Sequence, residues 1–263
     1  MLISLENRTI IFHTPKTGGT SLSAALRPLF DRPERALLIL PITRLQRNDR
    51  GEIVLQKHQA GQPLGSAEDV SWISPFVLPH PKSPFLKKHS TPQDVVGFFT
   101  SEFLESCKYI VPIRDPISRT HSAYRFAIKD ALHLQAAGKR NRHYDYLLKG
   151  SEPISFSEFI SDERTLNLLP SQPQIKWVPT WAAGTENLRL IRTENLAADT
   201  AKALLWAGMP DEEVSKVCSV LATTRKNTTA RPSDDSEPTA EEADTIRDIY
   251  SDDFALYEAT RSS

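Results

Sequence analysis

A short stretch near the N-terminus, residues 15–21 (Pro-Lys-Thr-Gly-Gly-Thr-Ser), combines one lysine, two glycines and three hydroxyl side chains. Glycine has no Cβ, so the backbone N–H groups can approach a ligand closely, and successive N–H groups form concavities that bind anions. The lysine adds a positive charge and the hydroxyl groups add further donors. The stretch therefore predicts an anion site, most often occupied by a phosphate, formed by Lys16, Thr17, Gly18, Gly19, Thr20 and Ser21.

The residues on either side of this stretch predict the elements that position it. Residues 9–12 form a short apolar run that is typical of a β-strand, and apolar residues then recur at helical spacing from Leu22 to Phe30. The order is strand, glycine loop and helix, which directs a helix N-terminus toward the loop. A tight strand-to-helix turn without a ligand is the alternative interpretation.

The loop differs from the phosphate loop of nucleoside triphosphatases. That motif is Gly-x4-Gly-Lys-Ser/Thr, in which the lysine follows the last glycine and the hydroxyl holds magnesium. Here Lys16 precedes both glycines. A nucleotide or small-molecule kinase that uses ATP would need a degenerate form of the motif, so it stays as an alternative function.

A second set of polar residues follows another apolar run. Residues 107–113 read as a buried strand, and Pro116 is suited to the first turn of a helix that extends to about residue 134. Arg114 lies between them and can present a bidentate fork to a phosphate. Ser122 follows about two helical turns later. The alternatives are a structural Arg114–Asp115 ion pair, or Asp115 as a magnesium-binding carboxylate at the end of a strand.

Both motifs resemble those of sulfotransferases that use 3′-phosphoadenosine 5′-phosphosulfate (PAPS). The His-x-Pro-Lys-Thr-Gly-Gly-Thr-Ser string, residues 13–21, is similar to the 5′-phosphosulfate loop of the carbohydrate-type branch, which includes heparan sulfate 2-O-sulfotransferase relatives. The Arg114-to-Ser122 pattern resembles the motif that binds the 3′-phosphate. Weaker similarities at residues 88–92, 190–196 and 250–254 extend the resemblance over most of the chain.

The resemblance implies a sulfotransferase that moves the sulfuryl group of PAPS, as a co-substrate, to a hydroxyl acceptor, with a carbohydrate favoured. It implies no metal. Residues 31–84 contain no matching motif, so acceptor choice is expected to lie there. A non-catalytic protein that binds PAPS or sulfated glycans is a second alternative of a different class.

The chemistry of sulfuryl transfer, by analogy with phosphoryl transfer, assigns the catalytic residues. Negative charge grows on the leaving oxygen, and Lys16 is expected to stabilise it. The acceptor hydroxyl needs a general base, for which histidine is suited because its pKa lies near neutrality. His89, just before the second motif, is the predicted base, and His58 is the second choice. The resemblance does not cast His13 as the base, and His121 is expected on a partly buried helix. A glutamate, which some relatives use, is a further alternative.

Length and composition indicate an ordinary soluble globular protein. The chain has 263 residues, of which 39% are hydrophobic and 25% charged, and its formal net charge is −1, which gives no reason to expect nucleic acid as a partner. Two cysteines are too few for a disulfide framework or a four-cysteine zinc site. Neither a transmembrane run nor a signal-peptide pattern is present, so a cytoplasmic enzyme without a membrane span is expected. The sequence does not indicate an oligomeric state.

The order of these elements predicts the architecture. Strands that alternate with helices favour an α/β fold, a P-loop-like three-layer sandwich with a central parallel sheet flanked by helices. We expect a single sulfotransferase domain over residues 1–263, in which residues 31–84 and 138–185 are irregular insertions on the acceptor side.

Overall fold

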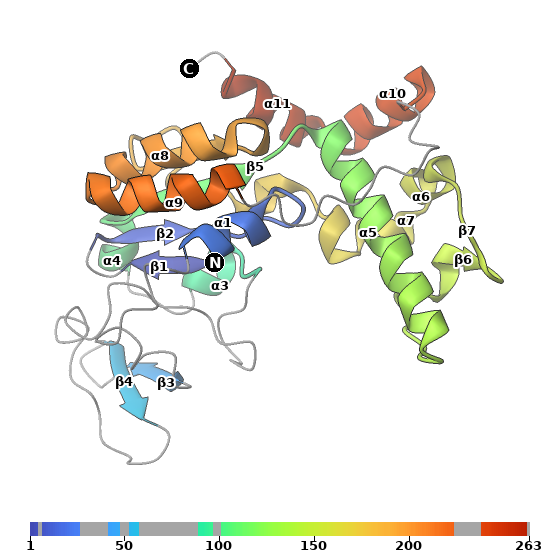
Figure 1. Cartoon of the computed structure of the whole chain (residues 1–263), viewed down its shortest axis with the longest axis horizontal. Coiled ribbons are helices and arrows are strands. Elements are labelled where there is room, and N and C mark those ends of the chain that lie inside the picture. Colours follow the sequence, from blue (N-terminus) through green and yellow to red (C-terminus); the bar gives the residue numbers. More distant parts are fainter. Residues whose placement is uncertain are drawn as a thin grey trace. The chain divides into compact units, whose positions relative to one another are not determined.

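The computed structural model describes residues 1–4, 7–26, 42–47, 53–57, 89–96, 101–223 and 238–261 (Figure 1). These residues form two compact units, which are described separately. The first consists of the described parts of Met1–Thr14, Gly18–Pro112 and Lys176–Lys226, and the second of those of Pro15–Thr17, Ile113–Ile175 and Asn227–Ser263. The prediction of a single domain with two insertions is not tested by this division.

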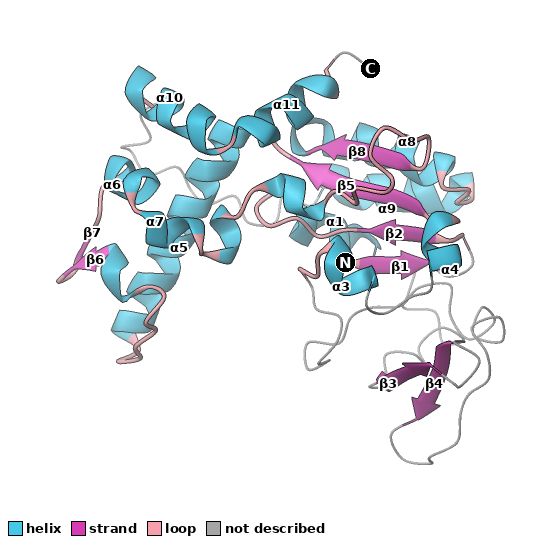
Figure 2. Ribbon diagram, turned by 180° about the vertical axis from the view of Figure 1, so that it is seen from behind, coloured by secondary structure: helices cyan, strands magenta, loops and turns pink. Residues whose placement is uncertain are grey.

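The first unit contains a four-stranded sheet in the order β1-β2-β5-β8 (Figure 2). Its strands are β1 (Leu2–Ser4), β2 (Thr9–Ile11), β5 (Lys108–Ile113) and β8 (Leu188–Arg192). Strand β1 runs antiparallel to β2, whereas β2, β5 and β8 form a parallel sheet. The predicted strands at 9–12 and 107–113 are therefore confirmed, and the carboxyl ends of three strands lie at one edge of the sheet.

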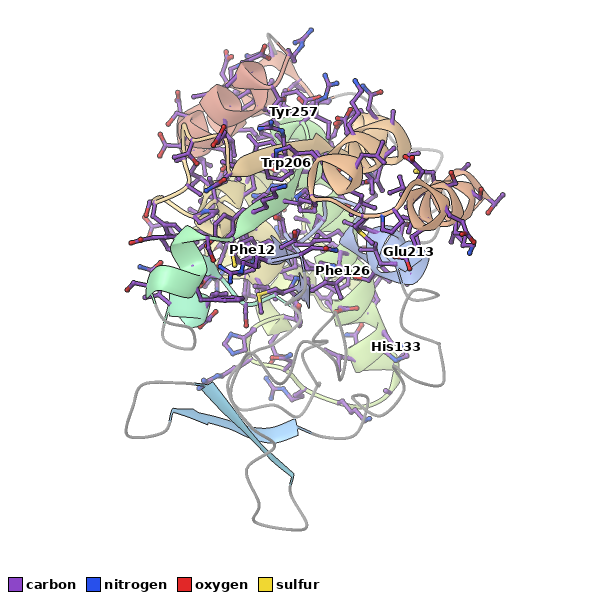
Figure 3. The ribbon with its side chains drawn as sticks, turned by 90° about the vertical axis from the view of Figure 1, so that its left-hand side faces the viewer. Phe12, Phe126, His133, Trp206, Glu213 and Tyr257 are labelled. Carbon is purple, nitrogen blue, oxygen red and sulfur yellow. The ribbon has the colours of Figure 1, made fainter. Side chains whose placement is uncertain are left out.

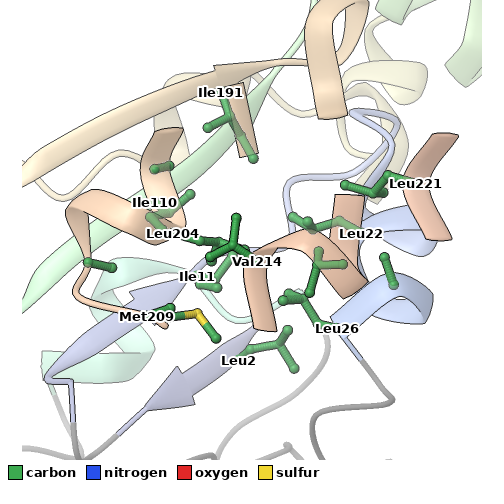
Figure 4. Packing of buried hydrophobic residues seen from close by; sticks show 14 residues of the cluster. Leu2, Ile11, Leu22, Leu26, Ile110, Ile191, Leu204, Met209, Val214 and Leu221 are labelled. Atoms are coloured by element: carbon green, nitrogen blue, oxygen red, sulfur yellow. The ribbon is translucent and has the colours of Figure 1, made fainter. Parts of the chain in front are cut away.

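Helices α1 (Gly19–Leu26), α8 (Leu196–Trp206) and α9 (Asp211–Thr223) cover one face of this sheet (Figure 1). Because side chains alternate along a strand, each parallel strand contributes one isoleucine to this face. Figure 4 shows these residues packed against leucines of the three helices and Met209. The isoleucines are Ile11, Ile110 and Ile191, each at most 4% exposed.

Helices α3 (Pro92–Val96) and α4 (Ser101–Glu105) lie on the opposite side of the sheet (Figure 2). Phe12 stacks on Tyr109 of β5, at a centroid distance of 6.4 Å. The Tyr109 hydroxyl donates to the Leu104 carbonyl and accepts a hydrogen bond from Trp181 Nε1. With helices on both faces of a central parallel sheet, the predicted α/β three-layer sandwich is confirmed.

Within the predicted insertion at 31–84, the described residues are two strands. Strand β3 (Ile42–Arg47) pairs antiparallel with β4 (Ile53–Lys57). The apolar run at residues 53–55 predicts a short strand, and β4 confirms it. The remainder of this segment lies outside the described residues.

The second unit is built on α5 (Pro116–Ala136), the helix predicted from residue 116. Its N-cap is Asp115, whose Oδ1 accepts a hydrogen bond from the Ser118 backbone N–H at 2.8 Å. Proline occupies the first helical position, where its missing N–H costs nothing. The Asp115 carboxylate therefore has a structural role as the helix cap, whatever the function of the site.

The shorter elements of this unit are η3 (Asp145–Leu147), β6 (Leu148–Lys149), β7 (Glu152–Pro153), α6 (Phe156–Ser161), α7 (Glu163–Leu166), η4 (Leu169–Ser171), α10 (Ala240–Ile249) and α11 (Ser251–Ala259). Of these, η3, β6, α6, η4, α10 and α11 pack against α5. Their core includes Ile128, Phe159 and Ile246. The short helices η5 (Gln174–Trp177) and η6 (Thr193–Asn195) precede β8 and α8.

The C-terminal region differs from its prediction. Apolar residues recur at helical spacing over residues 239–258 and predict one helix, but the structure has two, separated at Tyr250. The Tyr250 side chain is buried and its hydroxyl donates to the Ser171 carbonyl at 2.6 Å. At Tyr250, which makes this hydrogen bond, the backbone is not helical, with φ −117° and ψ 33°. The one-helix prediction was wrong because the spacing of apolar residues does not report such tertiary contacts.

Both cysteines are free thiols, as expected. Cys107 is fully buried, and burial raises the pKa of its thiol to about 12. Among the helices that the structure describes, none is long and apolar enough to cross a membrane.

Candidate active site

The glycine loop has an unusual backbone. Lys16 has a φ of +66° and Gly18 a φ of +74°, and Thr17 between them has no positive φ. A left-handed conformation costs a non-glycine residue roughly 1–2 kcal/mol, and such strain occurs most often at functional sites. Alternation of right- and left-handed residues turns successive N–H groups toward one side and forms an anion-binding nest. The loop therefore has the backbone expected for a phosphate site.

The side chain of Lys16 lies against α5. Its Nζ is 4.4 Å from the centroid of the Phe126 ring, a cation–π contact (Figure 3 labels Phe126). Ser122 lies four residues before Phe126, and residues four apart share a helix face. The half-buried Ser122 is thus one turn from the ring that Lys16 covers.

Arg114 is half-buried and follows directly after β5. Its Nη1 donates to the Lys16 carbonyl at 3.5 Å. Within the second unit, Lys16 of the first motif therefore contacts Arg114 of the second motif, and its side chain contacts Phe126 on the helix that carries Ser122. No hydrogen bond that we describe joins Arg114 to Ser122.

The two glycines serve different packing needs within the first unit. A Cβ on Gly18 would lie 3.2 Å from Leu196 Cδ2 and 3.4 Å from Thr193 Cγ2, at the turn between β8 and α8. A Cβ on Gly19 would lie 2.4 Å from the His13 ring, a separation that real atoms do not reach. Thr193 and Leu196 were not predicted as neighbours of the loop, although the resemblance at 190–196 was a signal for them.

The hydroxyl residues of the motif differ in exposure. Thr17 is completely buried, Thr20 is exposed and Ser21 is half-buried. Thr20 and Ser21 belong to the first turn of α1, whose N–H groups precede the regular hydrogen bond from Leu22 N–H to Gly18 C=O. The first turn is thus where backbone N–H groups are directed toward the loop.

His89 is held in one tautomer. Its Nδ1 lies 2.8 Å from the His13 carbonyl oxygen, which can only accept, so Nδ1 carries the proton. Nε2 of the neutral ring then has a lone pair and can accept a proton. The backbone carbonyl of His89 also accepts from Nε1 of the buried Trp177, at 3.3 Å. His89 therefore has the protonation geometry that a general base needs.

His13 is a structural partner of both His89 and Gly19. Its ring is 4% exposed and meets the His89 ring edge-on, with centroids 4.6 Å apart and an interplanar angle of 74°. Its Nδ1 is 3.3 Å from Ser23 Oγ on α1. The sequence suggested His13 only for the role of base, and no local pattern indicated that its ring would pack directly against Gly19.

The other candidate histidines are placed differently. His121 stacks on Phe156 at a centroid distance of 3.9 Å, which is an aromatic packing role in the second unit. His58 lies outside the described residues, so its assignment as second-choice base stays a prediction. The assignment of His89 as the base is likewise a prediction that the geometry is compatible with.

The contact between Gly19 and His13 leads to a stability prediction. Gly19→Ala is expected to lower the free energy of unfolding by about 1–3 kcal/mol, because the added methyl group must displace a buried ring. Thermal unfolding of Gly19→Ala, His13→Ala and the double variant measures this. The double variant should lose less than the two single losses combined; strict additivity would show that the ring does not impose the glycine.

Comparison with known proteins identifies the class. A family model described as the sulfotransferase family matches residues 1–258. This chain belongs to the sulfotransferase family, and sulfuryl transfer is the general activity of that class. Searches of curated proteins and of solved structures each found no match. Among the residues that the structure describes, no cluster of His, Cys, Asp or Glu could hold a metal ion.

Proposed function

We propose that this protein transfers the sulfuryl group of PAPS to a hydroxyl group of a carbohydrate. The observation that carries the proposal is the contact of Lys16 with both Arg114 and Phe126. PAPS bears a phosphosulfate at the 5′ position and a phosphate at the 3′ position. Lys16 and Arg114, one from each anion motif, lie on one compact unit, and this suits a ligand with two separate anionic groups.

The loop and the first turn of α1 are suited to the 5′ end of this donor. The backbone N–H groups of residues 17–21 would hold the 5′-phosphate, together with the hydroxyls of Thr20 and Ser21. The donor supplies a sulfuryl group attached to this phosphate. Lys16 would stabilise the negative charge that develops on the bridging oxygen as the sulfur–oxygen bond breaks.

Arg114 and Ser122 would bind the 3′-phosphate. An arginine makes two parallel charge-assisted hydrogen bonds to a phosphate, which gives both affinity and orientation. Ser122 lies one helical turn from the ring covered by Lys16, so its hydroxyl is on the same face of α5. The Lys16 carbonyl contacts Arg114 and the Lys16 side chain contacts the helix that carries Ser122, so Lys16 would link the residues that hold the two ends of the donor.

His89 would take the proton of the acceptor hydroxyl through Nε2 as the new oxygen–sulfur bond forms. Its Nδ1–H is committed to the His13 carbonyl, so the ring accepts the proton without changing its tautomer. The carbohydrate acceptor is supported only by the resemblance of residues 13–21 to the carbohydrate-type branch. Catalysis in this scheme depends on positioning and charge, and no residue is assigned to a metal.

Titration with nucleotides tests the donor. A ligand that binds only the folded protein raises its melting temperature. We expect 3′-phosphoadenosine 5′-phosphate, the desulfated product, to raise it, and ATP with magnesium to raise it less. Arg114→Ala should weaken binding of the bisphosphate by roughly 10- to 100-fold, because a hydrogen bond to a charged group contributes about 1.5–3 kcal/mol.

The control is Arg247→Ala, which removes an exposed arginine that pairs with Asp244 on α10. It should leave both titrations unchanged. A shift with ATP and magnesium alone would favour the kinase, and binding of the bisphosphate without any sulfuryl transfer would favour the non-catalytic binder.

A further inference from the structure

Arg114 is held by a side chain that sequence analysis did not connect with the site. The side-chain amide of Gln174 forms hydrogen bonds to both the N–H and the C=O of Arg114. Its Oε1 accepts from the Arg114 N–H at 3.0 Å, and its Nε2 donates to the Arg114 C=O at 2.9 Å. Because the peptide planes on both sides of one residue are fixed, the direction of its Cα–Cβ bond is fixed as well. Gln174 is completely buried, so water does not compete for these bonds.

Gln174 is in turn fixed by Asp253 of α11. The two carboxylate oxygens of Asp253 accept from consecutive backbone N–H groups, Oδ2 from Gln174 at 2.8 Å and Oδ1 from Ile175 at 2.9 Å. Asp253 is 0% exposed, and its pKa is raised by burial although the adjacent Arg119 opposes this. A carboxylate has two acceptor oxygens, so it can accept from both N–H groups at once.

Arg119 completes the network from α5. Its Nη2 is 3.4 Å from Asp253 Oδ2, and both side chains are at most 2% exposed. The same guanidinium donates to the backbone carbonyls of Pro170 and Gln172, at 3.2 and 2.6 Å. Between residues 170 and 175, two backbone carbonyls are thus bonded to an arginine and two backbone N–H groups to an aspartate.

We propose that Gln174 and Asp253 are positioning residues that aim the Arg114 guanidinium at the 3′-phosphate of the donor, with Arg119 holding Asp253. This inference rests on the proposed function, because it assigns the bound phosphate to Arg114. Buried ion pairs contribute little net stability compared with apolar packing, so a role in orientation explains the Arg119–Asp253 pair better than a role in stability alone. The C-terminal helix α11 would then belong to the nucleotide site.

The test compares two nucleotides that differ only in the 3′-phosphate. Affinities of the full chain for 3′-phosphoadenosine 5′-phosphate and for adenosine 5′-phosphate are measured by calorimetry, and their ratio is the 3′-phosphate preference. The wild-type preference is expected to be roughly 10- to 100-fold, the value of a hydrogen bond to a charged group. A merely structural residue would change both affinities together and leave the ratio as it is.

Two isosteric variants and one control decide the inference. Gln174→Glu keeps the bond to the Arg114 N–H but sets a carboxylate oxygen against the Arg114 carbonyl. Asp253→Asn replaces one acceptor by a donor that faces a backbone N–H or Arg119. Each is expected to reduce the preference about tenfold, on the scale of one charge-assisted hydrogen bond. Asp252→Asn, at the exposed neighbouring position, should leave it unchanged.

The possible outcomes separate the inference from the proposed function. A wild-type protein without a 3′-phosphate preference overturns the proposed function itself. A wild-type preference that persists in Gln174→Glu and Asp253→Asn, while both affinities or the melting temperature fall, overturns the positioning role alone. If Asp253→Asn does not fold, since it leaves Arg119 without its buried counter-charge, Gln174→Glu decides the question.

Discussion

Lys16→Ala is expected to lower turnover by at least about 100-fold, the loss typical of removing one group that stabilises developing charge. Its effect on stability should be small, because the cation–π contact with Phe126 contributes only about 0.5–1 kcal/mol. Alanine retains a Cβ, so the left-handed backbone at this position keeps its strain. The measurement is transfer of a radiolabelled sulfuryl group from PAPS to a mixture of carbohydrate acceptors.

The matched control for this change is Lys202→Ala. Lys202 is exposed on α8 and its removal should alter neither turnover nor melting temperature. Full turnover in Lys16→Ala would contradict the assignment of Lys16 to the leaving oxygen. A loss that is explained entirely by weaker PAPS binding would assign Lys16 to donor affinity and not to the chemical step.

His89→Asn is expected to lower turnover by about 10²–10⁴-fold and to leave donor affinity intact. The asparagine amide can still donate to the His13 carbonyl where Nδ1–H does now, but it cannot accept a proton. The wild-type rate should also fall toward acidic pH, because an imidazolium ring has no lone pair for the acceptor proton. The residual rate of the variant should lack that dependence.

The control for the base is His133→Asn, at an exposed position near the end of α5 (Figure 3). It should retain wild-type rates at every pH. If His89→Asn keeps its turnover and His58→Asn loses it, the general base is His58. If both retain turnover, a carboxylate takes the role, as sequence analysis left open.

Features governed by neighbouring residues could be predicted from the sequence. The start of α5 is an example, because Asp115 caps the Ser118 N–H and Pro116 fits the first helical turn, and both effects act within four residues. The alternation of strands with helices likewise gave the α/β sandwich. The lysine, the glycines and Arg114 were recognised because each motif is a short continuous pattern.

Features that depend on distant contacts could not be predicted. The left-handed backbone of Lys16 is unusual for lysine, and residue type alone gives no reason to expect it. The Arg119–Asp253 pair joins residues 134 positions apart, and each residue alone resembles an ordinary surface charge. The break at Tyr250 has the same origin, since its hydroxyl bonds to Ser171, 79 positions away.

The division of the chain into two units has a practical consequence for protein engineering. The polypeptide passes from one unit to the other after residues 14, 17, 112, 175 and 226, so neither unit is a continuous segment. A recombinant fragment that starts at Ile113 and stops at Ile175 would contain Arg114, Arg119 and Ser122. It would lack Lys16 and Asp253, and with them the contact of Arg114 with Lys16 and the contacts of Arg119 and Gln174 with Asp253 on α11.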